Sequence, residues 1–351
     1  MSGTPAGSLV DAYDLVIFDL DGVIYLIDRP IAGAVEAVAR LHAERKPLAY
    51  ATNNASRRPA EVAELLVGMG VNARPDEVLT SSVAAAAALA ERLPAGAAVL
   101  VVGAEALRAE VRAVGLVPVE RADQSPDAVV QGYGPQVGWT DLAEASVAIR
   151  AGALWVATNT DRTLPSPRGP LPGNGSLVAA LRTALNRDPD LVVGKPEPAL
   201  FGTAARQAGA ERPLAVGDRL DTDIEGAARA GMDSLLVLTG VSSAADLLIA
   251  PPSTRPTYVA HDLRGLFDAD SVVRLGVGPT PAEDQAGPVV IEADGWRLSL
   301  DGQKAELSGA GRSLHALRLL CAAAWSGHPV LRVRPGSEAA GTALGELGLT
   351  S

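Results

Sequence analysis

The sequence predicts an α/β protein, in which a doubly wound, Rossmann-like parallel sheet core carries an inserted α/β cap domain and a small C-terminal α+β appendage. Between Leu15 and Leu238, short apolar segments alternate with longer amphipathic segments. The apolar segments are hydrophobic at every position, which is typical of parallel strands covered on both faces. After Leu266 this alternation stops. At 351 residues and 48% apolar content, the chain is long enough for more than one core.

The strands and helices are predicted in chain order from these segments. The first series has strands at 15–18, 47–51 and 78–80 and helices at 34–44 and 59–68. The second has strands at 98–102, 128–131 and 154–157 and helices at 104–114, 141–150 and 176–186. The third has strands at 191–193, 214–216 and 234–238 and helices that start at Pro196 and Thr222. We therefore expect residues 1–83 and 189–266 to form the core sheet and residues 84–188 to form the inserted cap.

The C-terminal part of the chain differs in composition. Residues 267–287 include a run rich in glycine, proline and acidic residues and are interpreted as a linker. Residues 288–351 predict a hairpin at 289–291 and 296–300, a helix at 313–325 and a strand at 330–333. This order is similar to half of an acetyltransferase. However, Arg274-Leu275-Gly276-Val277-Gly278 is one residue short of the acetyl-CoA loop spacing, so we infer no acetyl transfer.

Charge and composition argue against several classes of partner. The net charge is −11, and no cluster of lysine and arginine is present, so we expect no nucleic-acid partner. No window approaches the roughly 18 apolar residues of a membrane span, and no basic start followed by an apolar stretch is found, so we expect a cytoplasmic protein with no membrane partner. Cys321 is the sole cysteine and is interpreted as a core residue of a protein from a reducing compartment.

Two acidic segments follow predicted strands. Asp19 and Asp21 come directly after the strand at 15–18, and Asp218, Asp221 and Asp223 follow the strand at 214–216. Ligands of open α/β sheets bind outside the carboxyl ends of the strands, and alternate residues of an extended segment face the same way. Because clustered carboxylates repel one another, they imply a hard cation such as Mg²⁺. We expect Asp218 to bind the metal and Asp221 to cap the following helix.

Two further strand ends offer groups suited to phosphate. Thr52 closes the strand at 47–51 and begins Thr52-Asn53-Asn54, whose hydroxyl and backbone N–H groups suit phosphate oxygens. Lys195 lies in Gly194-Lys195-Pro196, between a predicted strand and a helix start, and is one of only three lysines. We interpret an ammonium group at this place as a point charge for an anion, with a chance occurrence as the alternative.

These four segments, in this order, resemble the four motifs of the haloacid dehalogenase superfamily. The motifs are Asp19-Leu20-Asp21-Gly22-Val23, Thr52-Asn53-Asn54, Gly194-Lys195-Pro196 and Gly217-Asp218-Arg219-Leu220-Asp221-Thr222-Asp223. The resemblance covers about residues 13–265 and is to the phosphatase branch with a C2-type cap between the second and third motifs, the group of NagD-type and p-nitrophenyl phosphatase-like enzymes. It implies a Mg²⁺-dependent phosphomonoesterase.

The resemblance implies a role for each motif residue. Asp19 is the nucleophile that forms an aspartyl-phosphate, and Asp21 protonates the leaving alkoxide and later activates water. Mg²⁺ is held by the Asp19 carboxylate, the Asp21 carbonyl and Asp218, with Asp223 supporting these ligands from outside. The transferring phosphoryl oxygens are held by Thr52, Asn53, Asn54 and Lys195.

The cap is expected to choose the substrate. Candidate contacts lie in Asn159-Thr160-Asp161-Arg162 and around Asn174 in Pro172-Gly173-Asn174-Gly175-Ser176, where a turn that caps the next helix is the alternative. Arg57 and Arg162 either bind a second anionic group or are solvated. The chain looks like the actinobacterial glycerol 3-phosphate phosphatases, so the small-molecule phosphate ester expected first is glycerol 3-phosphate. A 2-phosphoglycolate, nucleotide or sugar phosphate is the alternative.

Two alternatives of other classes are considered. A phosphotransfer receiver also uses a strand-end Asp, a Thr and a Lys with Mg²⁺, but it lacks a large cap and an Asp two residues after its acceptor. In the second alternative, the C-terminal segment makes the chain chiefly a binding or regulatory protein. A homo-oligomer that forms through the cap or the C-terminal module is compatible with the sequence.

Overall fold

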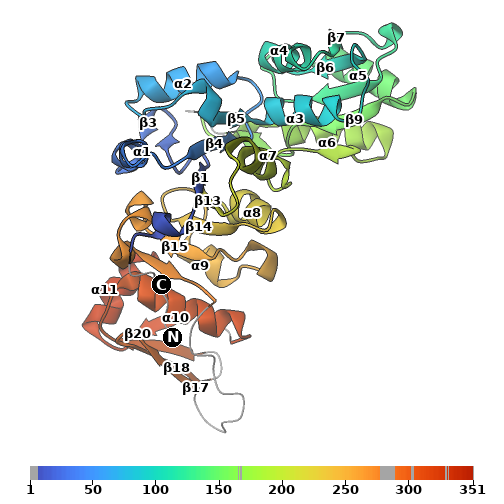
Figure 1. The fold of residues 1–351 in the computed structure, drawn as a ribbon. Helices are drawn as coiled ribbons and strands as arrows, with labels where there is room; N and C mark the ends of the chain where they lie inside the picture. The colour runs from blue at the N-terminus through green and yellow to red at the C-terminus, as the bar shows by residue number, and fades with distance from the viewer. Residues whose placement is uncertain are drawn as a thin grey trace. The chain divides into compact units, whose positions relative to one another are not determined.

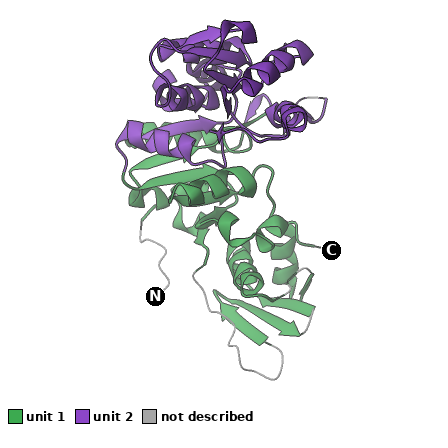
Figure 2. Cartoon of the chain, turned by 90° about the vertical axis from the view of Figure 1, so that its right-hand side faces the viewer, with its two compact units in different colours: residues 1–26, 31–46, 211–351 green, residues 27–30, 47–210 purple. Residues whose placement is uncertain are grey.

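The computed structural model describes residues 7–164, 166, 168–276, 289–301, 304–328, 330 and 332–350. Its contacts divide the chain into two compact units, shown in different colours in Figure 2. The first unit consists of residues 1–26, 31–46 and 211–351, and the second consists of residues 27–30 and 47–210. In this division, residues 47–83 and 189–210 fall in the second unit together with residues 84–188, and the C-terminal residues fall in the first unit.

The first unit contains five neighbouring strands of a sheet, in the order β16-β15-β14-β13-β1, and the last four of these are labelled in Figure 1. The strands are β1 (Leu15–Phe18), β13 (Pro213–Gly217), β14 (Asp233–Val237), β15 (Tyr258–Ala260) and β16 (Val272–Arg274). The first four run parallel, and β16 is antiparallel to β15. Every residue of β1 is buried, as expected for a strand covered on both faces. Phe18 is paired with Val216, so the carboxyl ends of β1 and β13 lie side by side.

Between residues 7 and 276, the helices of this unit have five residues or fewer, apart from α1 (Ala34–Ala43), which matches the helix predicted at 34–44 to within one residue. They are η1 (Leu9–Ala12), α1 (Ala34–Ala43), η4 (Leu220–Ile224), α8 (Glu225–Arg229), α9 (Ala244–Leu248), η5 (Pro252–Thr254), η6 (Leu263–Leu266) and η7 (Ala269–Ser271). The helix expected from Thr222 begins as a π-helical turn, in which the Ile224 N–H donates to the Arg219 carbonyl, and continues as α8. The expected linker begins with η7 and β16, and its residues 277–287 lie outside the described residues.

The C-terminal module is an α+β structure within the first unit. It consists of β17 (Val289–Ala293), β18 (Trp296–Asp301), β19 (Lys304–Gly309), α10 (Ser313–Trp325), β20 (Val333–Pro335) and α11 (Glu338–Glu346). The first three strands form an antiparallel meander, and β20 runs parallel to β19. The predicted strand at 330–333 thus starts later, and Leu331 lies outside the described residues.

The module shares its core with α9 and with strands β14, β15 and β16 of the sheet. Buried residues of β18 and α10, such as Trp296 and Leu317, belong to one hydrophobic cluster with Leu247, Val259 and Val273. Cys321 is buried in this cluster, and burial raises the pKa of its thiol. The core therefore runs without a break from β14 and β15 into the C-terminal module.

The second unit contains a parallel sheet of five strands in the order β12-β9-β8-β6-β7. Its sheet strands are β6 (Ala98–Val102), β7 (Val117–Val119), β8 (Ala128–Gln131), β9 (Leu154–Ala157) and β12 (Leu191–Val192). The same unit holds the parallel pair β4 (Leu48–Thr52) and β5 (Val78–Thr80), and the antiparallel pair β10 (Thr163–Leu164) and β11 (Leu171–Pro172).

The helices of the second unit are α2 (Pro59–Gly68), η2 (Pro75–Glu77), α3 (Ser81–Ala90), α4 (Glu105–Ala113), η3 (Ala122–Gln124), α5 (Trp139–Arg150), α6 (Asn174–Leu185) and α7 (Ala199–Ala208). The expected start of the insertion at residue 84 falls inside α3, which the alanine-rich sequence did not reveal to us as a helix. In the described part of the chain, no helix combines the length and apolarity that crossing a membrane requires.

Candidate active site

The structure brings acids from two distant segments together at one edge of the first unit's sheet. Asp19 follows β1 and donates its backbone N–H to the Val216 carbonyl of β13 at 2.8 Å. Asp218 follows β13 directly. Carboxylate oxygens of Asp19, Asp218 and Asp223 all lie within 4.8 Å of one another. The pairing of β1 with β13 is the reason that residues so far apart in the sequence meet.

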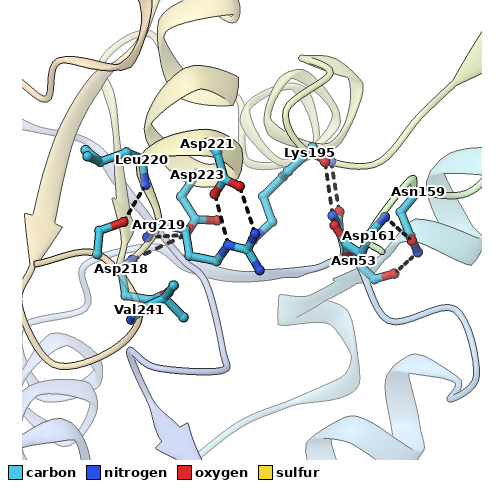
Figure 3. A network of polar contacts seen from close by, with 11 residues as sticks. Asn53, Asn159, Asp161, Lys195, Asp218, Arg219, Leu220, Asp221, Asp223 and Val241 are labelled. Atoms are coloured by element: carbon cyan, nitrogen blue, oxygen red, sulfur yellow. Dashed lines mark hydrogen bonds and ion pairs between the residues drawn. The ribbon is translucent and has the colours of Figure 1, made fainter. Parts of the chain in front are cut away.

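Asp223 holds the loop that carries Asp218. One of its carboxylate oxygens accepts the backbone N–H groups of Asp218 at 3.2 Å and Arg219 at 3.1 Å, as the left part of Figure 3 shows. Its side chain is buried. Asp223 is thus fixed by backbone donors and lies beside the other two acids, the place expected for a residue that supports metal ligands.

The expectation that Asp221 caps the following helix is wrong. Its carboxylate instead accepts two hydrogen bonds from the Arg219 guanidinium, at 3.0 and 2.9 Å. These bonds from Arg219 lower the pKa of Asp221. The physical reason is the π-helical turn that begins at Leu220, which places Asp221 within the turn rather than ahead of it.

The Asp218 side chain is 0% exposed and is held by a loop that our sequence reasoning missed. The Val241 N–H donates to its Oδ2 at 2.7 Å, and the Ser242 N–H donates to its carbonyl at 3.0 Å. Gly22 and Gly240 lie against the carboxylate so closely that a Cβ on either would overlap it. The signal that could have found this loop is Thr239-Gly240, which follows the apolar strand β14.

Asp21 lies in different surroundings from Asp19. It forms a bridge with Tyr25, whose hydroxyl lies 3.5 Å from its Oδ2. The intervening turn is tight, with Gly22 at φ +87°. The side chain of Asp21 is half-buried and is not part of the cluster of three acids. Two acids two residues apart therefore have distinct environments, which suits distinct roles.

In the second unit, Asn53 joins the second and third motifs. Its Oδ1 accepts the Lys195 backbone N–H at 2.8 Å, and its Nδ2 donates to the Lys195 carbonyl at 3.0 Å and to Asp161 Oδ2 at 3.1 Å (Figure 3, right). The Lys195 side chain is 3% exposed, and its Nζ donates to the Ala51 carbonyl at 3.1 Å. The amide of Asn53 is thus used to hold Lys195 in place.

The other expected phosphate ligands lie next to Asn53. Thr52 is buried at the end of β4, and its Oγ1 accepts the Asn54 N–H at 3.1 Å. Asn54 Oδ1 accepts the N–H and the hydroxyl of Ser56, each at 2.8 Å. Arg57 is exposed. Thr52 and Asn54 therefore shape a tight turn after β4, and Arg57 projects into solvent.

The cap residues expected to contact substrate form a buried amide network. Asn174 is 1% exposed, and its Nδ2 donates to the Asn159 carbonyl at 2.7 Å and the Gln131 carbonyl at 3.2 Å. Asn159 donates to the Asn53 carbonyl at 2.7 Å. Arg162 is exposed. Asn174 thus begins α6 and stabilises the carboxyl ends of β8 and β9.

The acidic cluster of the first unit fits a divalent cation. It offers carboxylate oxygens alone, the donor type that Mg²⁺ prefers, and two of its three residues are buried. Three such charges within 4.8 Å repel one another unless a cation or protons neutralise them. The side chains that the structure offers to such a cation are those of Asp19, Asp218 and Asp223.

Comparisons with known proteins identify the families that the chain resembles. Residues 16–117 match the model of the haloacid dehalogenase-like hydrolases, and residues 192–266 match a second model of such hydrolases. Residues 293–349 match a domain similar to the GCN5-related N-acetyltransferases.

Curated relatives extend the match to nearly the whole chain. A D-glycerol 3-phosphate phosphatase of Mycobacterium tuberculosis is 46% identical over 343 residues, which is 96% of this chain and 94% of the relative. An acid sugar phosphatase of Staphylococcus aureus is 36% identical and covers 72% of this chain and 95% of its own.

Solved structures show the same fold. The glycerol phosphate phosphatase of M. tuberculosis in complex with magnesium matches with a TM-score of 0.86 and 45% identity, over 98% of this chain and all of that chain. A 4-nitrophenylphosphatase from Thermotoga maritima matches with a TM-score of 0.68 and 33% identity, over 74% of this chain and 97% of that chain. The resemblance found in the sequence is confirmed, and the chain belongs to the haloacid dehalogenase-like hydrolases.

Proposed function

We propose that this protein is a magnesium-dependent phosphatase that hydrolyses glycerol 3-phosphate to glycerol and inorganic phosphate. The observation that carries the proposal is the match with the mycobacterial glycerol 3-phosphate phosphatase, which extends over 96% of this chain and includes the C-terminal module. The acid sugar phosphatase covers only 72%. The grouping of Asp19 with Asp218 at adjacent strand ends supports the same chemistry.

The reaction proceeds in two displacements. A carboxylate oxygen of Asp19 attacks the phosphorus and forms an aspartyl-phosphate, while the bond between phosphorus and the glycerol oxygen breaks. Asp21 transfers its proton to that oxygen, so glycerol leaves as a neutral alcohol. In the second step a water molecule attacks the phosphorus, Asp21 takes a proton from this water, and the bond to Asp19 breaks to release phosphate.

Charge must be neutralised before an anionic nucleophile approaches a phosphate dianion. When bound, Mg²⁺ supplies this neutralisation and orients the phosphate. By the family resemblance, Lys195 contributes a second positive charge, and Thr52 with the backbone N–H of Asn53 binds phosphoryl oxygens, whereas the Asn54 N–H is already donated to Thr52 Oγ1. Asp223 keeps Asp218 oriented through its bonds to the backbone N–H groups of Asp218 and Arg219.

The cap selects the leaving group, with Asn174 as its candidate binding residue, and Arg57, outside the cap, is a candidate for binding a second anionic group. The amide network of Asn53, Asn159 and Asn174 supports the alternative that Asn174 shapes the cap loops instead of touching the substrate. Other small phosphate esters, 2-phosphoglycolate first, are the alternative substrates. We place the activity in the cytoplasm, because the sole cysteine, Cys321, is a buried thiol.

The test is a substrate panel. With purified protein and Mg²⁺, kcat/KM is measured for glycerol 3-phosphate, 2-phosphoglycolate, nucleoside monophosphates, pyridoxal phosphate and sugar phosphates. We expect glycerol 3-phosphate to rank first. If it ranks below the sugar phosphates or nucleotides, the substrate assignment is wrong. If no ester is turned over more than once, the protein is not a phosphatase and a receiver-like role gains support.

A further inference from the structure

The loop that holds Asp218 links the acidic cluster to the rest of the first unit. This loop, residues 239–243, donates the Val241 N–H to Asp218 Oδ2 at 2.7 Å and the Ser242 N–H to the Asp218 carbonyl at 3.0 Å. The Ser242 hydroxyl in turn accepts the Leu220 N–H at 3.0 Å. The side chain of Asp218, its backbone carbonyl and the backbone N–H of Leu220 are therefore all hydrogen-bonded to this one short loop.

The loop leads directly into helix α9. Ser243 caps α9 by accepting the Asp246 N–H at 3.2 Å, and the Asp246 carboxylate accepts the Ser243 N–H at 2.9 Å. Bonds from Ser243 hold the pKa of Asp246 below its ordinary value. A helix of five residues is not stable alone in water, so α9 depends on its tertiary contacts.

The C-terminal module adds contacts to α9 beyond its packing on Leu236 and Val259 of the sheet. Trp325, the last residue of α10, donates its indole N–H to the Leu247 carbonyl of α9 at 3.1 Å. The Arg255 guanidinium lies 4.7 Å from the centroid of the Trp325 ring and donates to the Ala250 carbonyl at 3.0 Å. Leu247 itself is buried in the cluster that includes the inner face of α10. Trp325 thus fastens the end of α9 opposite to the loop.

The amino-terminal end of α10 is attached to the same sheet. Ser313 is hydrogen-bonded to the His261 ring at 3.1 Å, and the Arg312 guanidinium donates to the Asp270 carbonyl at 3.1 Å. His261 and Asp270 lie between β15 and β16, so the start of α10 is attached to the segment that joins these two strands. The end of α10 is attached to α9 through Trp325. The helix is thus anchored at both ends to the hydrolase part of the chain.

We propose that Trp325 is a positioning residue for the metal site, and that the acetyltransferase-like module raises Mg²⁺ affinity by holding α9 and, through it, the loop on Asp218. The inference rests on the proposed function, because it assumes that Asp218 is a Mg²⁺ ligand. Its physical basis is preorganisation. A ligand whose carboxylate is already fixed by the Val241 N–H loses less freedom when a cation binds.

A matched pair of tryptophans provides the test. Trp325 and Trp296 both belong to the C-terminal module and both donate the indole N–H to a backbone carbonyl, but Trp296 bonds within the module, to Arg312 at 3.0 Å. Trp325→Phe and Trp296→Phe each remove one such bond. The dissociation constant of Mg²⁺ is measured by calorimetry on the full chain, and thermal stability is measured alongside.

We expect both variants to lose stability and only Trp325→Phe to lose metal affinity, by about three- to tenfold, since removal of groups that orient ligands directly costs about 10- to 100-fold. At saturating Mg²⁺, kcat of Trp325→Phe should return close to that of the wild type. Unchanged Mg²⁺ affinity in Trp325→Phe, or an equal loss in Trp296→Phe, would overturn the inference.

Two further outcomes are distinguishable. If the wild-type protein binds no Mg²⁺, the proposed metal site itself fails, and the inference fails with it. If Trp325→Phe does not fold, Arg255→Met replaces it, because this change removes the contact with the Trp325 ring and the bond to Ala250 but keeps an aliphatic side chain. A Mg²⁺ affinity equal to that of the wild type in Arg255→Met then contradicts the proposal.

Discussion

Polar residues gather at the ends of parallel strands in both larger sheets of this chain, but the groups that meet there differ in kind. Where β1 and β13 end, Asp19 and Asp218 present carboxylates within 4.8 Å of each other. Where β8 and β9 end, the buried side-chain amide of Asn174 donates to the backbone carbonyls of Gln131 and Asn159. One strand edge gathers negative charge, and the other gathers neutral amides.

This difference in polar groups indicates which strand ends are suited to catalysis and which are suited to a structural role. Carboxylates are acceptors only, so a group of them needs a cation or donors from elsewhere. Amides carry both donors and an acceptor, and the Asn174 Nδ2 already donates to two backbone carbonyls, whereas Asn174 Oδ1 and Gln131 Nε2 are buried without a hydrogen-bond partner among the described residues. The edge with Asp19 and Asp218 is thus suited to a reaction, and the edge with Asn174 is suited to holding the loops that shape a binding surface.

The strongest test of this contrast is the substitution Asp19→Asn. It removes the attacking anion with almost no change of shape, so Mg²⁺-dependent phosphate release should fall at least about a thousandfold. Rapid-quench assays should detect no acid-labile phosphoenzyme. Asp28→Asn, at an exposed acid outside the cluster, is the control and should act as the wild type does. Near-normal turnover in Asp19→Asn would show that another residue is the nucleophile.

Metal binding gives the next largest effect. A hundredfold excess of Mg²⁺ over its dissociation constant should stabilise the wild type by about 2.7 kcal/mol. Asp218→Asn should lose most of this gain, and without Mg²⁺ it should be at least as stable as the wild type, because one of three repelling charges is gone. Asp221→Asn in the same loop should keep the gain, since Asp221 is paired with Arg219. Thermal melts with and without Mg²⁺ distinguish the two, and equal gains would remove Asp218 from the site.

A smaller effect is expected at the amide edge. Asn174→Ala leaves the buried carbonyls of Asn159 and Gln131 without this donor, so the free energy of unfolding should drop by about 1–3 kcal/mol. Thr183→Ala on the exposed side of the same helix should change it by less than about 0.5 kcal/mol. Denaturant unfolding measures both. If Asn174→Ala keeps wild-type stability and raises KM for glycerol 3-phosphate, Asn174 is a substrate ligand and not a structural amide.

The sequence predicted the parts of the fold and site that depend on patterns of side chains. Apolar segments that are followed by aspartates predicted β1 and β13. The prediction that Asp19 and Asp218 lie close together followed from these two strands. The loop at Val241 was missed because it acts through a backbone N–H, which any residue supplies. The role of Asp221 was wrong because the π-helical turn that redirects it has no signature in a single sequence.

Short elements with tertiary support were also missed. Strand β16 has three residues and helix α9 has five, so neither shows a period that can be read from sequence. They form because the C-terminal module and β15 cover them. Likewise, Asn174 is buried because it donates to the backbone carbonyls of Asn159 and Gln131. The folded sheet sets the positions of these carbonyls, so a single sequence does not reveal them.

The pairing of β1 with β13 also sets an order of assembly during synthesis. Leu15 is aligned with Pro213, so this partner of β1 leaves the ribosome roughly 200 residues later, after the whole insertion has been made. When the ribosome has completed the second unit, β13 has not yet been made. The fully apolar strand β1 therefore still lacks this neighbour at that stage. A transient exposed edge of this kind favours aggregation and binding by chaperones. Chains that stop before Pro213 would keep that edge open and would never assemble the acidic cluster.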